Sequence, residues 1–276
     1  MDDLQHKREF EEQGFTVRRG FFSREEAIRT LDEIHRVGLL TPSPSGLNKS
    51  QLTFYNNNFH HSQYIQSFIS QKKVVDLLRD IIGPDIWARW DQAVAKTPGG
   101  EEFPWHQDNG YNQLREEHFQ LWVALTDMKP EHGLLWLQPG SHKGGVLPHH
   151  REGNHLICLG KPEEAVSFEA QQGDVILFSS MMLHRTSPNV SKESRWAYVV
   201  EYMSLEQYDP FIDPPYFVVA REGKPCPEFL HNRPGRANPR NQAMYLIPRL
   251  RRGIQKRVRE PLENLRLKIL QSARRG

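Results

Sequence analysis

Four side chains in this chain of 276 residues have types and a spacing that suit metal chemistry: His106, Asp108, His184 and, eleven residues later, Arg195. On an extended strand, residues two positions apart project to the same face, so His106 and Asp108 can bind one ion together. His184, from a distant strand, then completes a set of three ligands. Two histidines and one carboxylate that leave other coordination positions open are typical of non-haem Fe(II) centres that activate O2.

The His106-x-Asp108 triplet is weak support when taken by itself. In a chain with 13 histidines, a His-x-Asp triplet often arises by chance. A lone His184 or Arg195 is also more often an ordinary satisfied polar residue or a surface charge. The hypothesis of a metal site therefore depends on the elements and the sequence blocks around these residues.

Residues 1–85 are predicted to be mainly helical, with a short extended segment at 15–22 between the first two helices. Ser23 and Glu26 match the capping box that begins a helix, and the apolar residues after them recur at helical spacing until Gly38, which is expected to end that helix. The predicted helices cover residues 4–13, 23–38 and 72–82.

The segment 41–62 is rich in Pro, Ser and Asn, which predicts a long loop. Long loops on barrels often form part of a site. Asn57 and Phe59 of this loop, together with Tyr111, are therefore candidate pocket residues.

Two histidine pairs, 60–61 and 149–150, could suggest a second metal site. Adjacent residues on a strand face opposite ways, so such a pair cannot easily chelate one ion. Solvated loops are the preferred interpretation.

From residue 86 onward the hydrophobic pattern changes to that of short strands separated by turn clusters. Many short strands after a helical part predict a mainly β fold with flanking helices. We expect a double-stranded β-helix, a cupin-like jelly roll, with the N-terminal helices packed on one sheet. The jelly-roll core is expected at about 86–203, within a single domain that covers 1–276. The predicted strands cover residues 86–96, 105–108, 121–126, 134–137, 166–169, 175–178 and 196–203.

Three blocks of the sequence resemble the phytanoyl-CoA dioxygenase family: FPWHQDNGY, LWVALTDMKPEHGLLWLQPGSHKG and GDVILFSSMMLHRTSPNVSKESRWAY. They span about residues 103–202. The family consists of Fe(II)- and 2-oxoglutarate-dependent oxygenases on a double-stranded β-helix. The resemblance therefore implies Fe(II) as the metal, 2-oxoglutarate as the co-substrate and O2 as the oxidant.

The resemblance also implies a role for each of the four residues. His106, Asp108 and His184 match the family's metal ligands. Arg195 matches the residue that pairs with the far carboxylate of 2-oxoglutarate, and a planar guanidinium that stays charged suits that role. Thr186 resembles the small hydroxyl residue that adds a hydrogen bond to the same carboxylate.

Two further residues are candidates for binding the co-substrate. Trp122 falls where the family often has an aromatic wall beside it, although a Trp in an apolar strand is usually a core residue. Gln92 shares one strand face with Val94 and Lys96, so its amide could reach the co-substrate or the substrate. A buried, satisfied amide is the alternative for Gln92.

The expected reaction is the hydroxylation, or another oxidation, of an unactivated C–H bond in a small organic metabolite, with release of succinate and CO2. Asp108 favours hydroxylation over halogenation, because related iron halogenases replace this carboxylate with a small residue so that halide can bind. A role in natural-product tailoring, within secondary metabolism, is preferred.

Two other classes of protein stay open. One is a catalytically inactive jelly roll that binds a metabolite or a structural zinc ion, and the other is a cupin-type enzyme that uses no 2-oxoglutarate. The complete ligand set with Arg195 argues against both.

Charge and composition restrict the partners. The chain has 36 basic and 34 acidic residues, a net charge of +2 that does not favour nucleic-acid binding. No stretch approaches the roughly 18 apolar residues of a transmembrane span. Two cysteines and a charged N-terminus predict a cytoplasmic protein.

The C-terminal segment 249–276 is strongly basic, with ten Arg or Lys residues and two Glu. Its apolar residues follow helical spacing on both sides of Pro261. A helical tail that packs on the barrel is the simpler interpretation. A weak contact with an anionic surface or an acidic carrier is the alternative.

Overall fold

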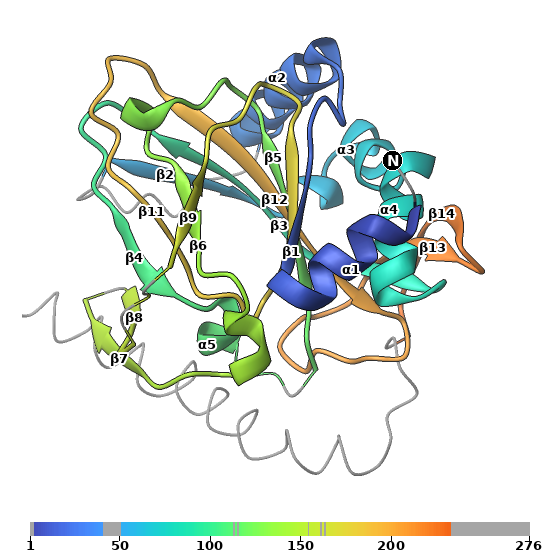
Figure 1. Cartoon of the computed structure of the whole chain (residues 1–276). Coiled ribbons are helices and arrows are strands. Elements are labelled where there is room, and N and C mark those ends of the chain that lie inside the picture. Colours follow the sequence, from blue (N-terminus) through green and yellow to red (C-terminus); the bar gives the residue numbers. More distant parts are fainter. Residues whose placement is uncertain are drawn as a thin grey trace, which may run out of the picture.

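The computed structural model describes residues 3–40, 51–112, 114, 116–153, 155–160, 162 and 164–232. Two β-sheets face each other, and helices cover the outer side of the larger one (Figure 1). The predicted mainly β architecture with flanking helices is confirmed. The helices are α1 (Asp3–Gln13), α2 (Arg24–Leu40), α3 (Gln63–Ile69), α4 (Lys72–Ile82) and α5 (Asp108–Asn112), with short 3-10 turns η1 (Asn58–His60), η2 (Pro130–His132) and η3 (Ser141–Gly144).

The larger sheet has eight strands in the order β1-β10-β5-β12-β3-β13-β14, and β2 also pairs with β3. The smaller sheet has the order β4-β11-β6-β9, while β7 and β8 form a separate pair. The strands of the larger sheet are β1 (Phe15–Arg18), β2 (Leu52–Asn56), β3 (Ile86–Lys96), β5 (Phe119–Ala124), β10 (Val175–Ser179), β12 (Arg195–Ser204), β13 (Tyr216–Arg221) and β14 (Lys224–Leu230). The remaining strands are β4 (Phe103–His106), β6 (Leu135–Leu137), β7 (His149–Glu152), β8 (His155–Cys158), β9 (Val166–Phe168) and β11 (His184–Thr186).

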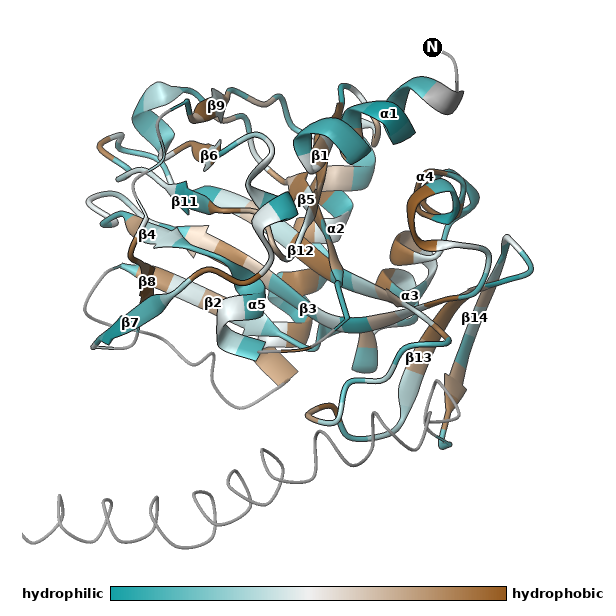
Figure 2. Ribbon diagram, turned by 60° about the horizontal axis from the view of Figure 1, so that its bottom comes forward, coloured by the Kyte–Doolittle hydropathy of each residue, from teal (hydrophilic) through white to brown (hydrophobic). Residues whose placement is uncertain are grey.

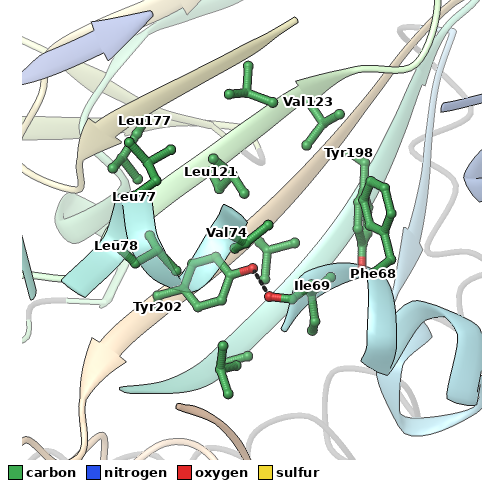
Figure 3. Packing of buried hydrophobic residues seen from close by; sticks show 14 of the residues in the cluster. Phe68, Ile69, Val74, Leu77, Leu78, Leu121, Val123, Leu177, Tyr198 and Tyr202 are labelled. Carbon is green, nitrogen blue, oxygen red and sulfur yellow. Dashed lines mark hydrogen bonds between the residues drawn. The ribbon is translucent and has the colours of Figure 1, made fainter. Parts of the chain in front are cut away.

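The main hydrophobic core lies between the larger sheet and the helices. Alternate residues of a strand face opposite sides of the sheet, and Leu177 of β10 and Leu121 of β5 both face the helices. Figure 3 shows these leucines beside α4 and Tyr202, whose hydroxyl donates to the carbonyl of Ile69 at 2.9 Å. Figure 2 shows apolar residues on the side of α4 that faces the sheet. The N-terminal helices therefore buttress the strands, as the sequence predicted.

A second hydrophobic cluster lies between the two sheets. The intervening residues of the same strands contribute to it, such as Ile176 of β10 and Trp122 of β5. Leu135 and Leu137 of β6 face them from the smaller sheet. Because both faces of the larger sheet are covered, β5 and β10 are buried along their whole length. The inner face is the one that can hold a ligand between the sheets.

The helix that follows Ser23 begins as predicted but ends later. Ser23 and Glu26 exchange the two bonds of a capping box, at 2.7 and 3.1 Å. The helix does not stop at Gly38 and continues to Leu40. A Cβ atom at position 38 would lie 2.5 Å from the ring of Tyr55, so glycine serves here for close packing against β2.

The predicted loop 41–62 was wrong in part. Residues 52–56 of the predicted loop form β2, which pairs with β3 and extends the larger sheet. Beyond the predicted range 86–203, β13 and β14 extend it further. The basic tail 249–276 lies outside the described residues. Among the helices that are described, none has the length and apolar character needed to cross a membrane.

Candidate metal centre and active-site cavity

Three potential ligands converge between the two sheets. His106 ends β4 and His184 begins β11, and these residues are paired directly across the two antiparallel strands. Oδ1 of Asp108 lies 3.6 Å from Nε2 of His106 and 3.7 Å from Nε2 of His184. One ligand atom from each residue lies within 4.8 Å of the others. Among the described residues, this is the group of His, Cys, Asp or Glu side chains that could hold a metal ion. The structure therefore brings the three predicted ligands together.

The far side of each imidazole is fixed by the backbone. Nδ1 of His106 lies 2.7 Å from the carbonyl oxygen of Pro104, and Nδ1 of His184 lies 2.9 Å from that of Met182. A carbonyl only accepts, so each Nδ1 carries the hydrogen and each Nε2 presents a lone pair to the centre. Ligating histidines have this arrangement in metal sites.

The protonation states also suit a cation. Burial, with the nearby His106, lowers the pKa of His184 to about 4. Burial alone would raise the pKa of Asp108, but His184 and His106 hold it well below its ordinary value. Neutral imidazoles and an ionised carboxylate are the forms that bind a metal ion. The donor set therefore fits Fe(II).

The local backbone differs from the prediction. Asp108 does not continue the strand but begins α5, so the same-face argument was wrong although the two side chains do meet. Gln107 between them is buried, and its amide bonds to the carbonyls of Gly145 and Met181, at 2.9 and 2.5 Å. These bonds anchor the turn that redirects Asp108 toward the histidines.

His149 supports the same turn, a role that the sequence did not predict. Its Nε2 accepts from the backbone N–H of Gln107 at 3.2 Å, and its ring packs against Gly110. The sequence predicted that the histidine pair 149–150 lies in a solvated loop, and this prediction is wrong for His149. His60 is also half-buried and stacks on Phe229.

Two cations lie at one end of the site. Arg195 begins β12 directly opposite Lys96 at the end of β3, and both are buried. Nη2 of Arg195 donates to the carbonyl of Gly133 at 2.8 Å, whereas its Nε has no hydrogen-bond partner among the described residues. Nζ of Lys96 donates to Oγ1 of Thr186 at 2.8 Å and to the carbonyl of Ser187 at 2.7 Å.

Burial lowers the pKa of both cations. It brings the pKa of Arg195 to about 10 and, with the charge of Arg195 beside it, that of Lys96 to about 6. The sequence placed Lys96 on one face with Gln92 but assigned it no function. The alternation along β3 was the signal that could have identified it.

A cavity of about 770 Å³ contains the whole constellation. Gln92, Trp122 and Thr186 line it, as does Tyr111. Gln92 also donates to Oδ1 of Asn56 at 2.9 Å. The cavity further contains a polar group at its other end, formed by Arg89, Gln120 and Glu201.

Two loop residues proposed for the pocket are elsewhere. Phe59 packs into the core between helices and sheet, where it stacks on Phe217. Asn57 is absent from the cavity lining and has a left-handed backbone, with φ of 60°. The formation of β2 directs the chain after it toward the helix side of the sheet.

The sequence matches the model of the phytanoyl-CoA dioxygenase family over residues 10–197. A probable alpha-ketoglutarate-dependent hypophosphite dioxygenase of Stutzerimonas stutzeri is 26% identical, covering 74% of this chain and 79% of the relative. An ectoine dioxygenase of Nocardia farcinica is 25% identical over 78% of this chain and 84% of its own length. A phytanoyl-CoA dioxygenase of Arabidopsis thaliana is 35% identical over 38% of this chain and 40% of its length.

Solved structures with the same fold include several non-haem enzymes. The non-heme monooxygenase ThoJ superposes with a TM-score of 0.68 at 20% identity, covering 93% of this chain and 98% of ThoJ. EvdO2 of Micromonospora carbonacea var. aurantiaca, solved with 2-oxoglutarate, gives a TM-score of 0.62 at 23% identity. The match covers 74% of this chain and 91% of EvdO2. EctD of S. alaskensis with bound Fe gives a TM-score of 0.62 at 19% identity, covering 82% of this chain and 86% of EctD. These neighbours confirm the jelly-roll fold.

Proposed function

This chain belongs to the phytanoyl-CoA dioxygenase family, a group of Fe(II)- and 2-oxoglutarate-dependent dioxygenases, and from that premise we propose which residues perform the reaction. His106, Asp108 and His184 hold the iron. Arg195, Lys96 and Thr186 bind the far carboxylate of 2-oxoglutarate. The observation that carries the proposal is the convergence of three ligand atoms within 4.8 Å, with both Nε2 atoms free to coordinate.

When bound, Fe(II) and 2-oxoglutarate supply the oxidising chemistry, in which O2 oxidises both 2-oxoglutarate, to succinate and CO2, and a C–H bond of the substrate. The two histidines keep their Nε2 atoms directed at the metal because their Nδ1 hydrogens are held by Pro104 and Met182. Asp108 occupies the ligand position as a carboxylate, which favours hydroxylation over halogenation. Trp122 and Phe178 provide apolar walls that exclude water.

The cationic end orients the co-substrate. Lys96 lies opposite Arg195 and donates to Thr186, and all three line the cavity, so a carboxylate placed beside them can accept from their side chains. The unpartnered Nε of Arg195 is a donor that such a carboxylate would satisfy. Trp122 and Gln92 line the cavity between this end and Glu201, both level with Val199 of β12, and are proposed to contact the inner end of 2-oxoglutarate.

The first experiment adds Fe(II) and then 2-oxoglutarate to the purified protein without oxygen. A weak visible absorption band is expected when both are present, and succinate is expected when oxygen is admitted. The protein with 2-oxoglutarate and Zn(II) in place of Fe(II) is the control. If neither the band nor succinate forms, the dioxygenase proposal fails, and a metabolite-binding or metal-binding jelly roll becomes the better interpretation.

The Kd of 2-oxoglutarate is expected to increase as the pH rises above 6. In the free protein the pKa of Lys96 is lowered to about 6, with Arg195 and Glu102 as its charged neighbours. A bound carboxylate raises that pKa, so binding takes up a proton, and affinity falls by up to about tenfold per pH unit above 6. Titration of the visible band between pH 6 and 8 measures the slope.

The matched variants are Lys96→Met and Lys143→Met. Lys96→Met removes the titrating cation, so the Kd is expected to be higher at pH 6 and to lose this slope. Lys143 is exposed, and its replacement leaves both unchanged. A wild-type Kd that stays constant over the range would rule out Lys96 as a proton-linked contact.

The remaining parts of the proposal concern the setting of the enzyme. The substrate is a small organic metabolite that fits a cavity of about 770 Å³, and a role in secondary metabolism stays a prediction. A cytoplasmic location has the support of two unpaired thiols, Cys158 and Cys226. The single-domain organisation of 1–276 and the contact of the basic tail with an anionic surface or a carrier also stay predictions.

A further inference from the structure

The cavity has a second polar end, on the same strand as Arg195. Arg195, Ala197, Val199 and Glu201 all line the cavity, as alternate residues of β12 must if one faces it. At about 3.3 Å per residue, Glu201 lies about 20 Å along the strand from Arg195. The cationic end therefore has a counterpart that carries carboxylates.

The charges at this second end do not balance among the described residues. Arg89 is buried and pairs with two carboxylates, Glu201 through Nη1 and Asp209 through Nε. Nε2 of His118 lies 3.6 Å from Glu201, but burial holds the pKa of His118 well below its ordinary value, so this imidazole is neutral. One guanidinium thus faces two buried carboxylates, and Glu201 is the one that lines the cavity.

Gln120 provides an independent observation at the same place. It lies directly across from Glu201 on the neighbouring strand β5 and is fully buried. Neither its side-chain oxygen nor its nitrogen has a hydrogen-bond partner among the described residues. Buried polar groups nearly always have partners, and Gln120 lines the cavity. The side-chain oxygen of Gln120 is therefore free to accept a hydrogen bond from a molecule in the cavity.

The intervening wall is largely apolar. Trp122 and Val199 lie between the two ends, and Phe211 and Ile212 lie on the cavity wall as well. A molecule bound there can place an apolar segment beside the metal ligands while a polar group reaches Glu201. Burial raises the pKa of Glu201 to about 7, and the nearby charge of Asp108 adds to this shift, so the two parts of the cavity are adjacent.

We propose that Glu201 and the side-chain oxygen of Gln120 bind a protonated amine of the primary substrate, which is therefore a small cation with an apolar body. This inference rests on the proposed function, since it assigns the substrate class of the same site. An ammonium group offers only donors, which both oxygens can accept, and its charge offsets the excess carboxylate beside Arg89. The bound amine holds the apolar body with its C–H bonds near the metal ligands.

The test uses simple probes and a readout that does not need turnover. Butylammonium, hexylammonium and octylammonium are titrated against the intrinsic tryptophan fluorescence, to which Trp90 and Trp122 of the cavity wall contribute. Alkanols of the same chain lengths are the neutral probes. The protein is loaded anaerobically with Fe(II) and 2-oxoglutarate, and the visible band is recorded in the same samples. An ammonium probe is expected to bind about tenfold more tightly than its alkanol, or better.

Two variants test whether Glu201 and Gln120 bind the ammonium group. Glu201→Gln removes the charge and keeps the shape, so the preference for ammonium is expected to fall to less than about threefold. Gln120→Leu removes the amide without touching the pair with Arg89, and is expected to weaken ammonium binding at least about threefold. Glu228→Gln changes an exposed carboxylate on β14 and leaves binding unchanged. Circular dichroism and melting curves verify that each variant is folded.

The outcomes separate the two hypotheses. The inference is overturned if the alkanols bind as tightly as the ammonium ions, if no ammonium probe binds, or if both folded variants keep the full preference. In each case a normal visible band leaves the dioxygenase proposal intact. If the wild-type protein shows no visible band, the dioxygenase proposal fails, irrespective of how the ammonium and alkanol probes bind.

Discussion

Succinate formation is expected to fall at least about 100-fold when His106 is replaced by alanine, because loss of even a supporting contact to a metal ligand costs about 10–100-fold. His106 supplies one of the two Nε2 atoms that face Asp108. Without it, only two of the three protein ligands remain, His184 and Asp108. Succinate is measured by mass spectrometry after a fixed time in air, and bound iron is measured after anaerobic gel filtration.

The matched control is His150→Ala. His150 lies on β7 with its side chain 47% exposed, and its nearest charged neighbour is Glu152 at 3.7 Å. This variant is expected to keep wild-type iron content and succinate yield. Equal activity of His106→Ala and wild type would exclude His106 as a ligand.

Replacing Arg195 with methionine is expected to raise the Kd of 2-oxoglutarate about 100-fold or more. Removing one partner of a buried charge pair costs about 3–5 kcal/mol, because the remaining charge is left uncompensated. Arg195 is buried and its Nε has no other partner among the described residues. The Kd is obtained from the visible band as 2-oxoglutarate is added to the Fe(II)-loaded protein.

Two other arginine variants complete this prediction. Arg195→Lys keeps a charge but loses the planar fork, so its Kd is expected between those of wild type and Arg195→Met. Arg221→Met changes an exposed arginine of β13 that pairs with Glu228, and it is expected to leave the Kd unchanged. If Arg195→Met binds 2-oxoglutarate as wild type does, the far carboxylate lies elsewhere.

Much of the site was predictable because it depends on residue types and local spacing. His106, Asp108, His184 and Arg195 stand in sequence blocks that resemble one family, and the family match over residues 10–197 confirms that resemblance. The period of two along β3 correctly placed Gln92 and Lys96 on one face, and both line the cavity. The capping box of Ser23 and Glu26 was likewise predictable, because its two hydrogen bonds join residues that are only three positions apart.

The errors arose where distant contacts override a local pattern. Gly38 has the properties of a helix stop, but α2 continues to Leu40, and the glycine instead leaves room for the ring of Tyr55. Residues 52–56 have a loop-like composition around them, yet they add a strand to the edge of β3. His149 became a support of the metal turn only because its strand folds back beside Gln107.

By itself, the sequence determined the kind of chemistry: the ligand types, the arginine for a carboxylate, and the alternation that directs side chains to one face of a strand. Only the tertiary structure decided which groups share the cavity. The pairing of β11 with β4 puts His184 opposite His106, and the pairing of β12 with β3 and β5 puts Arg195 beside Lys96 and Glu201 beside Gln120. The physical reason is that a local pattern fixes which side chains share a face of a strand, whereas the choice of neighbouring strand depends on burying whole sheet faces together.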